Sequence, residues 1–156
     1  MLERCYDHKY QLKKPTYVGC SVVKEWLSFM SFREWMMGQE WEGKHLDKDA
    51  LKVGNKVYGP DTCVFIDMAT NSLLSEKIKP GKALPFGVSM RGNRYHAQCN
   101  TGGKNMSLGF FDDPEIAHAA WRRKKAKSLA RAAIRQTDSR VTVALLSRAT
   151  NLLYGD

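Results

Sequence analysis

The chain has 156 residues, of which 43% are hydrophobic, and a formal net charge of +9. This length suffices for one ordinary hydrophobic core or for two small ones. It contains no run of about 18 apolar residues, which argues against a membrane-spanning helix, and its charged start, MLERCYDHKYQLKKP, lacks the apolar segment of a secretory signal. We therefore expect a cytoplasmic protein without a membrane partner.

The positive charge is concentrated in the second half of the chain. Residues 1–78 hold 11 Lys or Arg and 11 Asp or Glu, whereas residues 79–156 hold 14 and 5. A half with this excess favours a polyanionic partner over a surface that merely confers solubility. Nucleic acid is the commonest such partner, ahead of an acidic membrane surface.

The first expected element is a helical region at residues 22–37, VVKEWLSFMSFREWMM. Its apolar residues recur at spacings of three and four, which indicates an amphipathic helix or two short helices broken near Ser31. Aromatic residues in such a stripe are typical of a hydrophobic core, so we expect support for the following segment rather than a cofactor site. The stripe consists of Trp26, Phe29, Met30, Phe32, Trp35 and Met36.

Four cysteines stand at positions 5, 20, 63 and 99 without a CxxC pair. In a reducing compartment, lone cysteines are usually small buried apolar groups. A zinc site would need the irregular spacing of Cys5, His8, Cys20 and Cys63, so we expect structural cysteines and no zinc.

Residues 44–77 are expected to form a strand, a hairpin, a second strand and a helix. Residues 44–51 can extend, and turns are predicted on either side of a short strand at 57–58. The β-branched and aromatic run at 62–66 favours a further strand. Asp67 then stands where it can cap a helix that ends near Lys77.

Alternation along the first of these strands puts His45, Asp47 and Asp49 on one face. Such groups, together with Asn71 from the following helix, could hold a divalent cation, Mg²⁺ or Mn²⁺, through oxygen ligands. The cation would polarise a scissile phosphate while a nearby base activates water. The predicted metal ligands are Asp47, Asp49 and Asn71.

The run LDKDALKVGNKVYGPDTCVFIDMATN, preceded by WLSFxxFREW, resembles small bacteriophage-encoded proteins of the HNH homing-endonuclease group. The resemblance extends over residues 4–75 and implies a ββα-metal unit. It places Asp47 at the metal-binding acid, Asn55 or Asp61 in the loop, and Asn71 at the last position, on the helix.

One departure from the HNH pattern bears on catalysis. The family usually places its base histidine directly beside the acid, where this chain has Lys48. Lysine is a poor general base unless burial lowers its pKa by several units, and His45 is the nearest imidazole. We expect His45 to be the base and Lys48 or Lys56 to meet phosphate, or else the site to have become a structural or DNA-contacting hairpin. The predicted catalytic residues are His45, Asp47, Lys48 and Asn71.

A second domain is expected after a linker at residues 79–85, where two prolines and a glycine interrupt the pattern. Three short strands follow, joined by glycine-containing turns, and they predict an antiparallel meander with one polar and one apolar face. On the third strand, Met106, Leu108 and Phe110 are the apolar residues. Asp113-Pro114-Glu115 then starts a helix with a stripe of small residues. The strands are predicted at 87–91, 94–100 and 104–110.

The pattern GVS, YHA and LGFFDDPEIAHAAW resembles the plant ethylene-response-factor, or Apetala-type, DNA-binding domain, which also occurs attached to phage HNH endonucleases. The resemblance implies a three-stranded sheet laid into the DNA major groove and braced by the helix. The plant domain has more arginine and a tryptophan on this face, so its sequence preference does not carry over. By alternation, the DNA-facing residues are Ser89, Arg91, Arg94, His96, Gln98, Asn100, Lys104 and Ser107.

The sequence thus predicts an α+β protein of two small domains with a C-terminal helix. The leading function is a phage-type HNH-like endonuclease that binds double-stranded DNA and acts in the host cytoplasm. The alternatives are a DNA-binding protein that has lost catalysis, acting as a regulator or inhibitor, and a module that binds a phage or host protein. The predicted segments are a ββα domain at 1–78, the linker at 79–85, a DNA-binding domain at 86–135 and a helical tail at 136–156.

Overall fold

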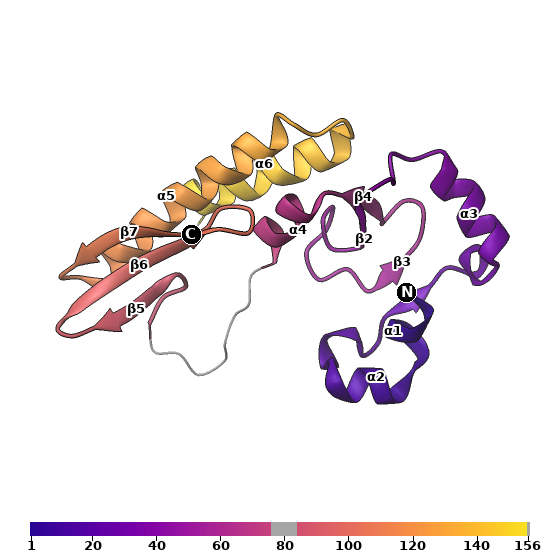
Figure 1. Ribbon diagram of the computed structural model, residues 1–156, viewed down its shortest axis with the longest axis horizontal. Helices are drawn as coiled ribbons and strands as arrows, with labels where there is room; N and C mark the ends of the chain where they lie inside the picture. Colours follow the sequence, from indigo (N-terminus) through magenta and orange to yellow (C-terminus); the bar gives the residue numbers. More distant parts are fainter. Residues whose placement is uncertain (76–83, 156) are drawn as a thin grey trace. The chain divides into compact units, whose positions relative to one another are not determined.

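The computed structural model describes residues 1–75 and 84–155 and has a mixed α+β fold (Figure 1). The chain divides into two compact units, Met1–Asp67 and Met68–Asp156. This division falls before the predicted boundary at residue 78, and most of the predicted linker, residues 79–83, lies outside the described residues. Within the described part of the chain, no helix is long and apolar enough to cross a membrane.

The first unit combines short helices with two small sheets. Strand β2 pairs with β4 in antiparallel fashion, whereas β3 pairs in parallel with β1. The predicted hairpin is therefore wrong in its pairing, because its middle strand joins a segment more than 30 residues earlier in the chain. The elements are α1 (Leu2–Tyr6), α2 (His8–Lys13), η1 (Pro15–Tyr17), β1 (Ser21–Val22), η2 (Lys24–Leu27), α3 (Phe29–Met37), β2 (His45–Asp47), β3 (Val57–Tyr58) and β4 (Val64–Ile66).

The helical region at residues 22–37 forms two short helices, which is one of the two arrangements that the sequence predicts. The break between them lies at Ser28 and not near Ser31. The break changes the direction in which the following side chains point. Trp26 is buried, whereas Phe29 is 69% exposed. The predicted apolar stripe is therefore interrupted where the two helices meet.

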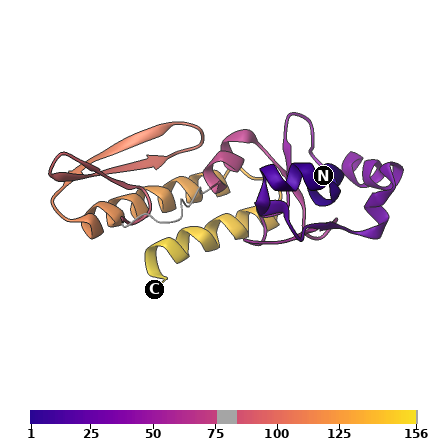
Figure 2. The same ribbon diagram turned by 90° about the horizontal axis from the view of Figure 1, so that it is seen from below.

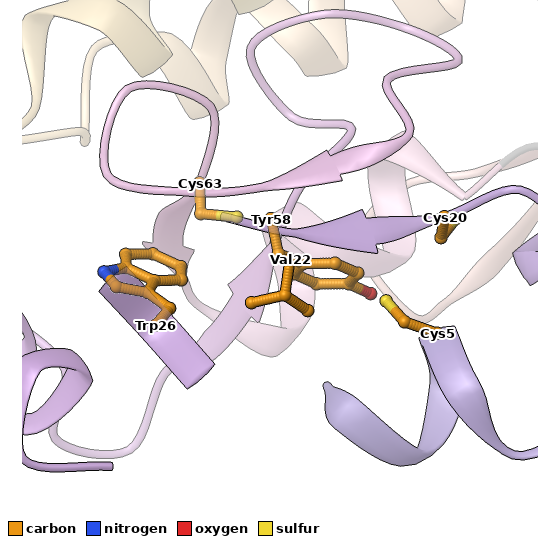
Figure 3. Packing of buried hydrophobic residues seen from close by; sticks show 6 residues of the cluster. All are labelled: Cys5, Cys20, Val22, Trp26, Tyr58 and Cys63. Carbon is orange, nitrogen blue, oxygen red and sulfur yellow. The ribbon is translucent and has the colours of Figure 1, made fainter. Parts of the chain in front are cut away.

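The core of the first unit gathers three cysteines around Tyr58, Val22 and Trp26 (Figure 3). Trp26 also contacts the rings of Phe32 and Trp35. Burial raises the pKa of the Cys63 thiol to about 11, so this sulfur stays protonated and unreactive at neutral pH. All four cysteines are buried free thiols, which agrees with the structural role predicted for them.

The second unit is a three-layer arrangement of one sheet and two long helices. The sheet is antiparallel with the order β5-β6-β7, α5 covers one face of it, and α6 lies along α5 (Figure 2). The predicted strands and C-terminal helix are confirmed. The elements are α4 (Met68–Leu74), β5 (Val88–Arg91), β6 (Arg94–Asn100), β7 (Asn105–Phe111), α5 (Pro114–Ala133) and α6 (Ser139–Tyr154).

Helix α5 begins where the sequence predicts it. The Asp113 carboxylate accepts hydrogen bonds from the backbone N–H groups of Glu115 and Ile116, and Pro114 occupies the first helical position. These contacts satisfy N–H groups that have no partner within the helix. The tail helix α6 packs on α5 through buried Val141 and Leu145.

Helix α4 belongs to the second unit, not to the strands that precede it. Its carbonyl at Leu73 accepts a hydrogen bond from the buried Lys125 ammonium of α5. The amide of Asn100, at the end of β6, donates to the Ser72 hydroxyl. Because α4 is held by α5 and β6, the predicted unit of two strands and this helix is divided between the two compact units.

Candidate nucleic-acid interface

Helix α5 covers one face of the sheet in the second unit, and we call the other face the open face. The open face consists of the side chains of Ser89, Arg91, Arg94, His96, Gln98, Ser107 and Phe110. On the covered face, Val88 and Ala97 are paired across strands and pack with Ala117 of α5. On the open face, Ser89 is paired with His96 and Gln98 with Ser107. Most of the predicted DNA-facing residues therefore share one surface, while Lys104 lies in the turn before β7.

A β-bulge in β7 places Phe110 on the open face. The register pairs Gln98 with Ser107 but Ala97 with Gly109, so Leu108 is the additional residue. Gly109 adopts a φ of +111, a backbone conformation that favours glycine. The expectation that Met106, Leu108 and Phe110 share one apolar face is therefore wrong for Phe110, which is 49% exposed.

His96 lies on the predicted face but is buried, with only 9% of its surface exposed. Its ring stacks on Phe110 with centroids 4.6 Å apart. Its Nε2 lies 2.7 Å from the Ser107 hydroxyl, and its Nδ1 lies 2.9 Å from Nε2 of Gln98. These contacts hold the His96 ring against Phe110 and between the polar groups of Ser107 and Gln98.

The predicted cationic residues differ in how they are held. The Arg94 guanidinium donates to the Asp112 carboxylate at 2.8 Å and to the carbonyl of Phe110 at 3.0 Å. Arg91 and Lys104 are exposed. They are therefore better placed than Arg94 to contact phosphate or base edges.

Asn100 has a structural role that the alternation did not indicate. Its side-chain oxygen accepts hydrogen bonds from the backbone N–H groups of Gly102 and Gly103, both at 2.9 Å. Its amide also reaches Ser72 of α4. These contacts fix the turn between β6 and β7, so we expect Asn100 to shape the interface without reading a base. Ser89 is half-buried on β5.

In the first unit, Lys48 is a structural residue of the loop that follows β2. It is 6% exposed, and its ammonium donates to the Asp49 carboxylate at 2.7 Å and to the carbonyl of Asn55 at 2.6 Å. The Asn55 amide donates back to the carbonyls of Lys48 and Val57. The reciprocal hydrogen bonds between Lys48 and Asn55 close the loop. The sequence-based prediction that Lys48 contacts phosphate did not indicate this role.

Asp47 is also engaged in the loop. Its Oδ1 accepts hydrogen bonds from the backbone N–H groups of Asp49 and Ala50, at 2.7 Å and 2.6 Å. His45 is exposed at the start of β2. Lys56, the other predicted phosphate contact, donates to the backbone carbonyls of Thr16 and Val18.

The predicted ligands do not fit a divalent-metal site in this arrangement. Asp47 holds the turn, and Asp49 faces a lysine ammonium that competes with a cation for the carboxylate. Asn71 lies on α4. Over residues 1–75 and 84–155, no three His, Cys, Asp or Glu side chains come together in a way that could hold a metal ion.

Comparison with known proteins yields no relative: no family model, curated protein or solved structure matches the chain. The resemblances to the HNH and Apetala-type groups therefore depend on the sequence motifs alone.

Proposed function

We propose that this chain is a DNA-binding protein that holds double-stranded DNA through the open face of β5-β6-β7 without cutting it. The observation that carries the proposal is the open face itself, a row of polar and basic side chains on a sheet whose other face is anchored by α5. The charge of the second unit supports it, since Met68–Asp156 holds 15 Lys or Arg against 6 Asp or Glu.

A sheet of this kind suits duplex DNA for geometric reasons. The major groove admits a β-ribbon, and base edges there are read by side chains that project from one face of the strands. Side chains on alternate positions of a strand point the same way, so Gln98 and Ser107 can be presented together to the groove. Arg91 and Lys104, near the two ends of the meander, can then meet phosphates and fix the orientation.

Helix α5 carries a second basic surface against which this proposal can be tested. Arg123, Lys127 and Arg131 recur at intervals of four and are exposed. Residues at this spacing lie along one side of a helix. Such a stripe is often simply solvated, and two of its residues supply a control with the same charge as Arg91 and Lys104.

The double variant Arg91→Ala/Lys104→Ala is expected to bind duplex DNA about 10- to 100-fold more weakly than the parent chain, because two phosphate contacts are lost together. The slope of log affinity against log salt concentration should fall by about 0.9 for each phosphate contact removed. Fluorescence anisotropy with a labelled duplex at several salt concentrations measures both quantities.

The matched control is Lys127→Ala/Arg131→Ala, which removes the same charge from the solvent-exposed side of α5. It is expected to weaken binding much less, through long-range electrostatics alone. An equal or larger loss in this control would move the binding surface from the sheet to the helix and contradict the proposal.

Endonuclease activity is the competing proposal, and the exposed His45 two residues before Asp47 on β2 favours it. Against it stand the contacts that occupy Asp47, Lys48 and Asp49 within the loop. We expect no nicking of supercoiled plasmid by the purified chain with Mg²⁺ or Mn²⁺. Cleavage by the parent that His45→Ala and Asp47→Asn both abolish, with their folds intact, would establish the nuclease instead.

A further inference from the structure

We propose that Gln98 and Phe110 form a reader of A·T base pairs, in which the Gln98 amide binds adenine and the Phe110 ring contacts the thymine methyl group. The inference rests on the proposed DNA binding and specifies which bases the open face prefers. It follows from the contacts of His96, which joins the two residues, and from the β-bulge that turns Phe110 toward the open face.

The orientation of the Gln98 amide is fixed by His96. The amide nitrogen of glutamine can only donate, so the contact between Nε2 of Gln98 and Nδ1 of His96 makes Nδ1 the acceptor. The ring proton then lies on Nε2, which donates to the Ser107 hydroxyl. Gln98 keeps its amide oxygen and one further N–H for another partner, and this pair of groups matches N6 and N7 of adenine.

Phe110 is an apolar group placed among polar ones. Its ring is about half exposed and its orientation is set by stacking on His96, with an interplanar angle of 21°. The only apolar group that a base pair presents in the major groove is the C5 methyl of thymine. A fixed aromatic ring next to an amide that matches adenine is therefore complementary to an A·T pair.

The contacts of Arg94 argue against guanine at the same place. Arginine reads guanine by donating two hydrogen bonds to O6 and N7, but the Arg94 guanidinium already donates to Asp112 and to the carbonyl of Phe110. Gln98, Ser107 and Phe110 then lie at the centre of the open face, and of these Gln98 supplies the amide and Phe110 the apolar ring.

The test uses three labelled duplexes of equal length: alternating A·T, alternating G·C, and the A·T duplex with every thymine replaced by uracil, which lacks the methyl group. The parent chain should bind A·T more tightly than G·C by between about 5-fold and about 150-fold, the range for one bidentate base contact. Replacing thymine by uracil should weaken binding by about 4-fold for each methyl group that the protein buries in the A·T complex.

Variants assign the two parts of the preference. Phe110→Ala should bind the A·T and A·U duplexes equally, and Phe110→Leu, which keeps apolar bulk, should retain part of the difference. Gln98→Ala should lose most of the preference for A·T over G·C. The control Met106→Ala removes an exposed apolar side chain paired with Cys99 on the same strand pair, and it should leave both preferences unchanged.

Three results would overturn the inference, and they distinguish its failure from the failure of the proposed function. If the parent chain binds A·T and G·C duplexes equally, or if Phe110→Ala still senses the methyl group, DNA binding stands but this reader does not. If no duplex is bound at low salt, the proposed function fails and the inference fails with it.

Discussion

Gly87→Ala is expected to lower the free energy of unfolding of the second unit by about 2–5 kcal/mol, since forced overlap and backbone strain add. A Cβ built on Gly87 would lie 2.2 Å from Cδ1 of Trp121, closer than real Cβ atoms approach any neighbour. The φ of +80 at this position adds strain for any residue with a side chain. Trp121 cannot move aside easily, because its ring contacts both Phe86 and His118.

The control for this substitution is Gly92→Ala in the turn between β5 and β6. Gly92 also has a positive φ, +58, but a Cβ there would meet no atom within 4 Å. It carries the backbone strain without the overlap, so its cost is expected to be about 1 kcal/mol. Urea unfolding followed by circular dichroism compares the free energies of unfolding of Gly87→Ala and Gly92→Ala. Equal losses in the two variants would show that overlap with Trp121 does not add to the cost at Gly87.

The cost at Gly87 reflects how the sheet is attached to α5. The carbonyl of Phe86 lies 2.8 Å from Nδ1 of His118, and the two rings flank Trp121. The chain therefore enters β5 directly against the helix that braces it. A destabilised attachment would also disturb the open face, so DNA binding by Gly87→Ala should fall together with its stability.

The second unit could be predicted well because its signals are local. Alternation along residues 94–100 and the sequence Asp113-Pro114-Glu115 specify a strand and a helix start without reference to the rest of the chain. The bulge beside Gly109 is different, since it exists only in the pairing of β7 with β6. An alternating pattern has no means of indicating an additional residue, and Phe110 was therefore assigned to the wrong face.

The first unit was predicted less well because its pairing is not local. Val57–Tyr58 reads as the middle of a hairpin, but Tyr58 is buried with Val22 in a core formed by the N-terminal segment. The short strands contain too few residues to specify a partner from alternation. The HNH resemblance predicts catalytic and metal-binding roles for Asp47, Lys48 and Asp49. In the structure these side chains form hydrogen bonds within the loop.

Lys48→Met is expected to lower the stability of the first unit by about 1–3 kcal/mol, the usual contribution of hydrogen bonds made by a charged group. Methionine keeps most of the apolar stem, so the change removes mainly the ammonium group and its bonds to Asn55 and Asp49. The Asp49 side chain is 48% exposed, so water replaces the lysine there at little cost. Most of the expected loss therefore comes from the carbonyl of Asn55.

Lys52→Met is the matched control, because Lys52 lies in the same loop and is exposed. Its effect should stay within about 0.5 kcal/mol, as for most surface substitutions. Urea unfolding followed by tryptophan fluorescence measures both variants, since three of the four tryptophans, Trp26 in the core among them, belong to this unit. If Lys48 served catalysis, Lys48→Met would keep the stability of the parent and lose only cleavage. A loss of stability in Lys48→Met alone would instead identify the lysine as the residue that closes the loop, in the position where the HNH resemblance expects a base.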